Sequence, residues 1–309
     1  MYQQPILRPA NRIYPWGVDN RAEVRAFLSS RRAKITPEQA GLVLYSRNRR
    51  VPGLRRSEVA DLSGVSVEYY SQLERGNLGG VSDSVLEALC RALQLDDAER
   101  AHLLDLARAA GPAARRRRPV AQQIRPSVAR LLELMTDVPA LVQNARLDLL
   151  AVNPLGKALL APLFADGAAP VNVARFNFLD PQAHTFWGDW NRAAGDTVAM
   201  LRTAAGRDPY DKDLTDMIGE LSTRSNDFRI RWGAHDVRLH RTGTKHIHHP
   251  LVGDVHLSYE VMDLPADDGL SLVVFTADAG SPSDSAIRLL GSWAATHDQA
   301  ALASGPGDS

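Results

Sequence analysis

The chain has 309 residues, of which 44% are hydrophobic and 23% are charged, a composition typical of a folded soluble protein long enough for two ordinary domains. No run of about 18 apolar residues occurs, so we expect no membrane-spanning helix. The first 17 residues lack the pattern of a secretion signal. Cys90 is the single cysteine, which excludes a disulfide within the chain and a multi-cysteine metal site. These features predict a cytoplasmic protein.

The net charge of zero conceals two oppositely charged halves. Residues 1–118 carry 20 Lys and Arg against 13 Asp and Glu, whereas residues 119–309 carry 16 against 23. Such an asymmetry indicates two domains with different partners. The basic bias is strongest in residues 31–56, where eight cationic side chains stand against Glu38 alone. From charge alone, a solvated surface and a phosphate-binding surface both remain open.

The first half is predicted to be helical throughout. Residues 21–32 place apolar side chains on one face of a helix. Thr36–Gln39 has the pattern of a capping box with proline at the first helical position, so a second helix is expected to begin there. Ser82 is expected to cap a further helix, and Asp96 with Glu99 is expected to open another.

Residues Arg56–Gly76 form the most informative pattern in the chain. Gly64 permits a sharp turn between two short helices, and Ser66 can cap the second one. Four apolar side chains are expected to face the core from these helices: Val59, Leu62, Tyr70 and Leu73. The spacing predicts a helix-turn-helix that binds DNA. A purely structural helical bundle is the alternative.

A resemblance to the XRE-type helix-turn-helix is carried by VAxLSGVSxxYYxxLExG at residues 59–76. The lead-in RVPGLRR (50–56) and the doubled tyrosine resemble actinobacterial regulators built around an MmyB-like ligand-binding domain. The resemblance continues in LAVNPL (150–155) and HPLVG (249–253), although Val152 stands where tryptophan is expected.

The clearest break in the chain agrees with that division. Gly111 and Pro112 end a helix, and Arg115–Arg118 place like charges side by side. With the resemblance, this break predicts three segments: a DNA-binding domain over 18–110, a basic linker over 111–124, and an MmyB-like domain over 125–293.

The resemblance implies that the second helix of the motif enters the major groove of DNA. The side chains expected to read bases are Val67, Glu68, Ser71 and Gln72. The side chains expected to contact phosphates are Arg49, Arg50, Arg55, Arg56 and Arg75. For Glu68 and Arg75, a plain solvated residue is the alternative. Because one such domain reads only a few base pairs, the resemblance implies a homodimer on a near-palindromic operator in double-stranded DNA.

The second half is predicted to be α+β. Residues 125–136 form an amphipathic helix, with Val128, Leu131, Leu132 and Met135 on one face. Alternating patterns predict strands at 140–143, 147–152, 245–249, 255–264 and 270–277. Helices fill the interval between the second and third strands. This order predicts an antiparallel five-stranded PAS-like sheet, which the resemblance also implies.

A PAS-like sheet is concave and commonly holds a small molecule against its inserted helices. The candidate wall residues are Phe176, Phe178, Phe186, Trp187, Trp190, His246, His248, Tyr259, Phe275 and Arg238. Aromatic residues at such spacing are also typical of plain core. Arg238 or His235 can meet a ligand carboxylate or form a structural salt bridge. The resemblance implies an apolar, fatty-acid-like effector with a polar head.

Two other interpretations compete with a ligand-controlled regulator. Six of the nine histidines lie in residues 235–256, which raises a metal-dependent enzyme. His246 and His248 share one face of a predicted strand, but no metal-spaced carboxylate or HExxH motif accompanies them. We therefore expect no enzymatic activity, no cofactor and no metal. Alternatively, the acidic half only dimerises or contacts RNA polymerase, without a ligand.

Overall fold

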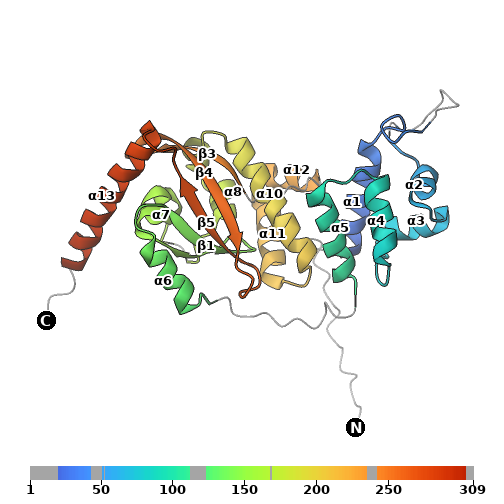
Figure 1. Ribbon diagram of the computed structural model, residues 1–309, viewed down its shortest axis with the longest axis horizontal. Coiled ribbons are helices and arrows are strands. Elements are labelled where there is room, and N and C mark those ends of the chain that lie inside the picture. The colour runs from blue at the N-terminus through green and yellow to red at the C-terminus, as the bar shows by residue number, and fades with distance from the viewer. Residues whose placement is uncertain are drawn as a thin grey trace, which may run out of the picture.

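The computed structural model describes residues 20–42, 51, 53–111, 123–167, 169–234 and 242–303, with side chains as far as Thr296. Its N-terminal part is built from helices alone in the described ranges, as predicted (Figure 1). These are α1 (Asn20–Lys34), α2 (Arg56–Ser63), α3 (Val67–Glu74), α4 (Asp83–Ala92) and α5 (Asp97–Ala109). Most of the predicted linker lies outside the described residues.

Helices α2 and α3 form the predicted helix-turn-helix. Gly64 ends α2 in the left-handed conformation, at φ 68°, which glycine adopts without steric cost. The Ser66 hydroxyl accepts the Tyr69 amide at 3.1 Å and so begins α3. Leu62 is 37% exposed and does not face the core as predicted. The buried side of α2 runs through Val59, Ala60 and Ser63, and Leu62 lies roughly 100° around the helix from its centre.

The predicted helix at Thr36–Gln39 is only a turn in the described residues. Its capping box does form, because the Thr36 hydroxyl accepts the Gln39 amide at 3.3 Å and the Gln39 side chain accepts the Thr36 amide at 2.9 Å. Gly41 then adopts φ 74°, a conformation that commonly ends a helical turn. Residues 43–50 lie outside the described part of the chain.

The C-terminal part combines helices with a sheet. In chain order its elements are α6 (Pro126–Leu134), β1 (Ala140–Asn144), β2 (Leu149–Val152), α7 (Pro154–Leu159), a 3-10 turn (Ala161–Phe164), α8 (Val173–Leu179), α9 (Ala183–Phe186), α10 (Trp190–Arg207), α11 (Lys212–Arg224), α12 (Asn226–Gly233), β3 (Thr242–His249), β4 (Gly253–Asp263), β5 (Leu270–Thr276) and α13 (Pro282–Ala303). The strands pair antiparallel in the order β2-β1-β5-β4-β3. The predicted α+β class and five-stranded antiparallel sheet are confirmed.

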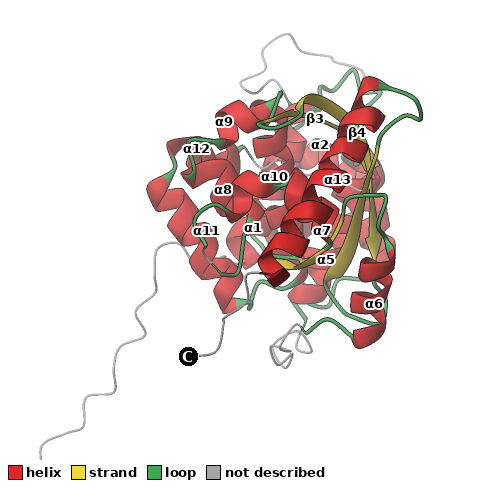
Figure 2. Cartoon of the chain, turned by 90° about the vertical axis from the view of Figure 1, so that its left-hand side faces the viewer, coloured by secondary structure: helices red, strands yellow, loops and turns green. Residues whose placement is uncertain are grey.

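The sheet has two apolar faces that different helices cover. On the inner face, Leu141, Tyr259 and Phe275 join the core formed with α7–α10, which Figure 2 shows to one side of the strands. On the outer face, α6 packs through Val128 and Leu132. Leu131, predicted to face the core, is 45% exposed, because α6 meets the sheet only through this narrow i,i+4 pair.

Helix α10 joins the two parts of the molecule (Figure 1). Arg202 in its second half has a fully buried side chain. Its guanidinium donates to the Glu23 carboxylate of α1 and to the carbonyl of Trp232. It also lies 4.3 Å above the centre of the Trp232 ring. A buried arginine is tolerated only when its charge and donors are matched in this way.

The last turn of α10 packs directly on α5. A Cβ at Gly206 would lie 2.7 Å from Cε1 of His102, so the two helices approach more closely than a side chain allows. The next residue, Arg207, places Nε 3.2 Å from Oδ2 of Asp105 on α5. The contact between α10 and α5 is therefore tight at its centre and charged at its rim.

We expect Arg202→Met to lower the free energy of unfolding by roughly 3 kcal/mol, because it leaves the buried Glu23 carboxylate without this arginine. Urea titration followed by circular dichroism measures the change. The double variant Glu23→Gln/Arg202→Met removes the unmatched charge and should recover part of the loss. A double variant no more stable than Arg202→Met would contradict this account.

Candidate DNA-contacting helix and effector cavity

The first two turns of α3 present the predicted base-reading side chains to solvent. Val67, Glu68 and Gln72 are exposed, and Ser71 is half-buried. Tyr69, which the sequence analysis did not include, is also exposed, at 36%. Its neighbour Tyr70 is fully buried, so the doubled tyrosine divides into one core residue and one surface residue. Helical periodicity distinguishes the two tyrosines, because Tyr70 shares a face of α3 with the buried Leu73 and Tyr69 does not.

The position of α3 is fixed by a buried carboxylate at its C-terminal end. Glu74 is 2% exposed. It accepts Nε and Nη2 of Arg32 on α1 at 3.0 and 2.8 Å, and it accepts Nε of Arg56 on α2. This contact raises the pKa of Arg56 and ties the helices of the motif to α1.

The predicted phosphate-contacting arginines differ in their surroundings. Arg55 and Arg75 are exposed at the ends of α2 and α3. The Arg56 side chain is 55% exposed but is held by Glu74, so it has a structural role that the sequence did not indicate. Arg49 and Arg50 lie outside the described residues.

A small cavity of about 80 Å³ lies between the inner face of the sheet and α8–α10. Its wall is mostly apolar, but Lys245 on β3 and Asp196 on α10 form an ion pair there, with Nζ and Oδ2 at 3.1 Å. The ammonium group also lies 5.3 Å from the centre of the Tyr259 ring and 5.7 Å from that of Trp187. The cavity thus has an apolar interior and one charged, aromatic corner.

A second cavity of about 270 Å³ adjoins the first. Gln143, Met200 and Val261 line both cavities and so form the partition between them. The second cavity is more polar and includes Arg207, the residue that pairs with Asp105 of α5. The two cavities therefore run from the aromatic corner towards the contact between α10 and α5.

Each of the two parts of the chain matches a known protein family. The profile of the MmyB-like transcription regulator ligand binding domain matches residues 124–290, and that of a helix-turn-helix domain matches residues 30–103. The chain belongs to the MmyB-like transcription regulators. It pairs a DNA-binding helix-turn-helix with a ligand-binding domain, as its resemblance indicated.

A comparison with curated proteins gave no match. Among the helices of the described residues, none has the length and apolarity needed to cross a membrane.

In this MmyB-like regulator the predicted pocket residues are distributed over several environments. Trp187, Tyr259 and Phe275 line the first cavity. Phe176 and Phe186 are buried in the inner core, and Phe178 and Trp190 contact each other edge-on at 6.2 Å. Arg238 lies outside the described residues, as does His235. The cavity wall also includes Lys245, Asp196 and Met200, which no local pattern indicates, because their helix and strand meet only in the folded chain.

His246 and His248 do not line the cavity. They alternate with Lys245 and Ile247 along β3, so their side chains occupy the opposite, outer face of the sheet. Burial and the neighbouring His256 lower the pKa of His246. A hydrogen bond with His248 lowers the pKa of Asp254, a carboxylate that the sequence analysis did not connect with these histidines.

We expect Glu74→Gln to lower the free energy of unfolding by roughly 2 kcal/mol, because Arg32 and Arg56 lose a buried charged partner. Thermal unfolding measures this change. Glu87→Gln, which breaks a surface pair with Arg100, is the matched control and should change stability little. Equal effects of the two substitutions would show that Glu74 does not organise the motif.

Proposed function

We propose that this regulator binds a near-palindromic operator as a homodimer, and that an apolar effector with an acidic head controls the binding. The observation that carries the proposal is the position of α10. Asp196, Thr197 and Met200 on this helix line the cavities. Further along the same helix, Arg202 contacts α1 and Arg207 contacts α5. A displacement at the cavity therefore moves the same rigid helix that holds the DNA-binding part.

The domain division that we propose follows the predicted one: a DNA-binding domain over 18–110, a basic linker over 111–124, and an effector domain over 125–293. The strand order β2-β1-β5-β4-β3 and the helices inserted between β2 and β3 support a PAS-like effector domain. The inner face of such a sheet is where a ligand is expected.

The effector that we propose is elongated and occupies both cavities. The first cavity alone, at about 80 Å³, is smaller than the roughly 300–1,000 Å³ of a small-molecule site. Joined to the second, of about 270 Å³, it reaches the lower end of that range. Movement of the flexible Met200 side chain would join them. An acyl chain then lies in the apolar cavity with its head towards Arg207.

This placement supplies a mechanism of control. A carboxylate near Arg207 competes with Asp105 of α5 for the same guanidinium, so binding weakens one contact between α10 and the DNA-binding part. In a dimer, the two α3 helices must enter grooves about 34–36 Å apart, and a change in this contact alters their separation. The coupling is reciprocal: an effector that weakens DNA binding must itself bind less tightly to the DNA complex.

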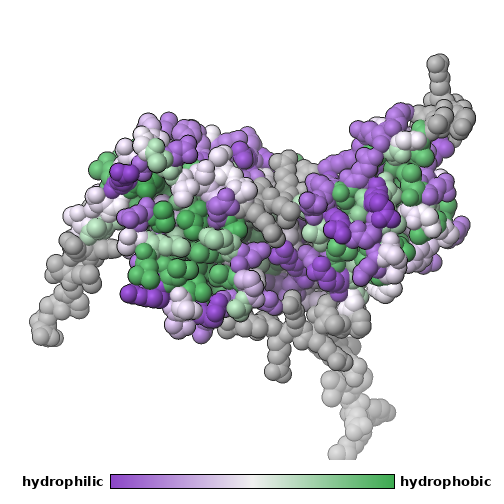
Figure 3. All heavy atoms as spheres, in the orientation of Figure 1, coloured by the Kyte–Doolittle hydropathy of each residue, from purple (hydrophilic) through white to green (hydrophobic). Residues whose placement is uncertain are grey.

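A ligand-independent regulator, whose C-terminal part only dimerises or contacts RNA polymerase, is the second candidate. It is favoured by apolar side chains that stay exposed on α6 and α13. Figure 3 shows apolar atoms gathered on the viewer's side of the effector part. Leu134 on α6 is 62% exposed and Leu289 on α13 is 63% exposed, and such side chains are typical of an interface when they form a patch.

We expect Gln72→Ala to weaken binding to the specific operator by about 1–3 kcal/mol and to relax the preference at one base, because the amide can pair bidentately with adenine. Titration of labelled DNA at fixed salt measures the change. Arg75→Ala should instead weaken binding to all sequences and reduce the salt dependence. Unchanged operator affinity in Gln72→Ala would contradict the assignment of this side chain.

We expect Met200→Trp to block the passage that would join the two cavities. It should therefore weaken binding of dodecanoate roughly 10-fold or more. Isothermal titration calorimetry on delipidated full-length protein measures this affinity. Ile230→Trp, on an exposed position of α12, is the control and should bind as wild type does. Equal affinities in the two variants would place the ligand elsewhere. No binding in any of the three proteins would favour the ligand-independent candidate.

A further inference from the structure

A compact group of metal-binding side chains lies on the outer face of the β3–β4 hairpin. In the strand register, His246 is opposite His256, and His248 is opposite Asp254. Residues two apart on a strand share a face, so all four side chains project from the same side of the sheet. The group is separate from the cavities, whose wall includes Lys245 and Tyr259 on the inner face.

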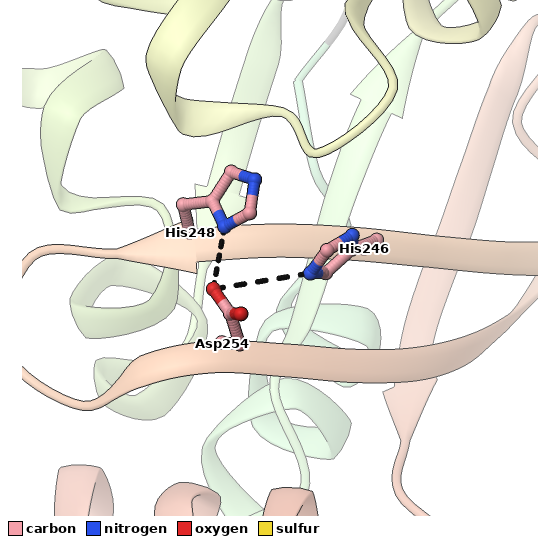
Figure 4. Close-up of side chains that lie close together, drawn as sticks. All are labelled: His246, His248 and Asp254. Carbon is pink, nitrogen blue, oxygen red and sulfur yellow. Dashed lines mark hydrogen bonds and ion pairs between the residues drawn. The ribbon is translucent and has the colours of Figure 1, made fainter.

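The ligand atoms of three of these residues converge on one point (Figure 4). Oδ1 of Asp254 lies 2.5 Å from Nδ1 of His248 and 3.9 Å from Nε2 of His246. The two histidine rings are 4.5 Å apart between centres. One nitrogen from each ring and a carboxylate oxygen all lie within 4.8 Å of one another.

The His246 ring packs against two neighbours. A Cβ at Gly188 would lie 2.1 Å from Nδ1 of His246, so the ring occupies space that only glycine leaves free. The His256 ring stacks on the His246 ring, with 4.1 Å between ring centres. Within the described residues, Nε2 of His246 is buried and has no hydrogen-bond partner, an arrangement that costs free energy unless a ligand satisfies the nitrogen.

We propose that His246, His248 and Asp254 bind a divalent transition metal, with Zn²⁺ as the representative ion. Two imidazole nitrogens and one carboxylate oxygen are donors that Zn²⁺ prefers. In a tetrahedral Zn²⁺ site with bonds of about 2.0–2.2 Å, the donor atoms lie about 3.3–3.6 Å apart, so the donor atoms of His248 and Asp254 must separate slightly and that of His246 must approach them. His248 and Asp254 are exposed and can make that adjustment. The fourth position is left to water or to His256.

The bound ion would hold the edge strand β3 against β4. β3 is the last strand in the order and pairs with β4 alone among the described strands. A metal bridge from His246 and His248 to Asp254 links these two strands on the outer face, directly behind the cavity wall. The site would thus act as a structural brace for the hairpin.

The experiment uses full-length protein without a histidine tag, stripped with EDTA and titrated with ZnSO₄ by isothermal titration calorimetry. We expect one Zn²⁺ per chain and a higher melting temperature with Zn²⁺. His246→Ala/His248→Ala should weaken binding roughly 100-fold, and Asp254→Asn should weaken it less. Gly188→Ala should also weaken it, because the added Cβ displaces the His246 ring.

Two controls make the result specific. His184→Ala removes an exposed histidine on α9 outside the group and should bind Zn²⁺ as wild type does. Mg²⁺, which prefers oxygen ligands, should not bind. Circular dichroism without metal checks that each variant is folded. Absence of Zn²⁺ binding in the wild type, or wild-type affinity in the folded double variant, would overturn the proposal.

Discussion

The buried ion pair between Arg202 and Glu23 is the interaction on which the arrangement of this regulator depends. A fully buried guanidinium carries a large desolvation cost, which is offset only while Glu23, the Trp232 carbonyl and the Trp232 ring all remain in place. Because these partners come from α1 and α12, the ion pair fixes α10 against two other helices. It therefore sets how the effector part meets the DNA-binding part.

The fixed position of α10 connects the cavities with the helix-turn-helix part. The same helix contributes Asp196 and Met200 to the cavities and Arg207 to the rim beside Asp105. At the other end of this path, Glu74 holds α3 to α1 through Arg32. Two buried carboxylates, Glu23 and Glu74, thus hold the successive helix contacts between the cavities and α3.

Strand alternation separates two kinds of chemistry on the same hairpin. Lys245 and Tyr259 face inward, where an ion pair and aromatic rings make a polar corner in an apolar cavity. His246, His248 and Asp254 face outward, where His248 and Asp254 are exposed to water. A shift of one residue in the register would exchange these faces. The buried Ile247, Val255 and Leu257 resist such a shift, because it would expose their side chains to water.

The sequence by itself determined the local structure: the turn at Gly64, the cap at Ser66, the capping box at Asp96 and Glu99, and the alternating strands. These features depend on hydrogen bonds and periodicities within a few residues, so they could be predicted without the fold. Only the tertiary structure decided which face of α2 and α6 is buried, where the cavities lie, and that Asp254 meets His248. It also decided that Arg202 meets Glu23, 179 residues away. Such contacts depend on how distant elements pack, and no spacing within one element encodes that.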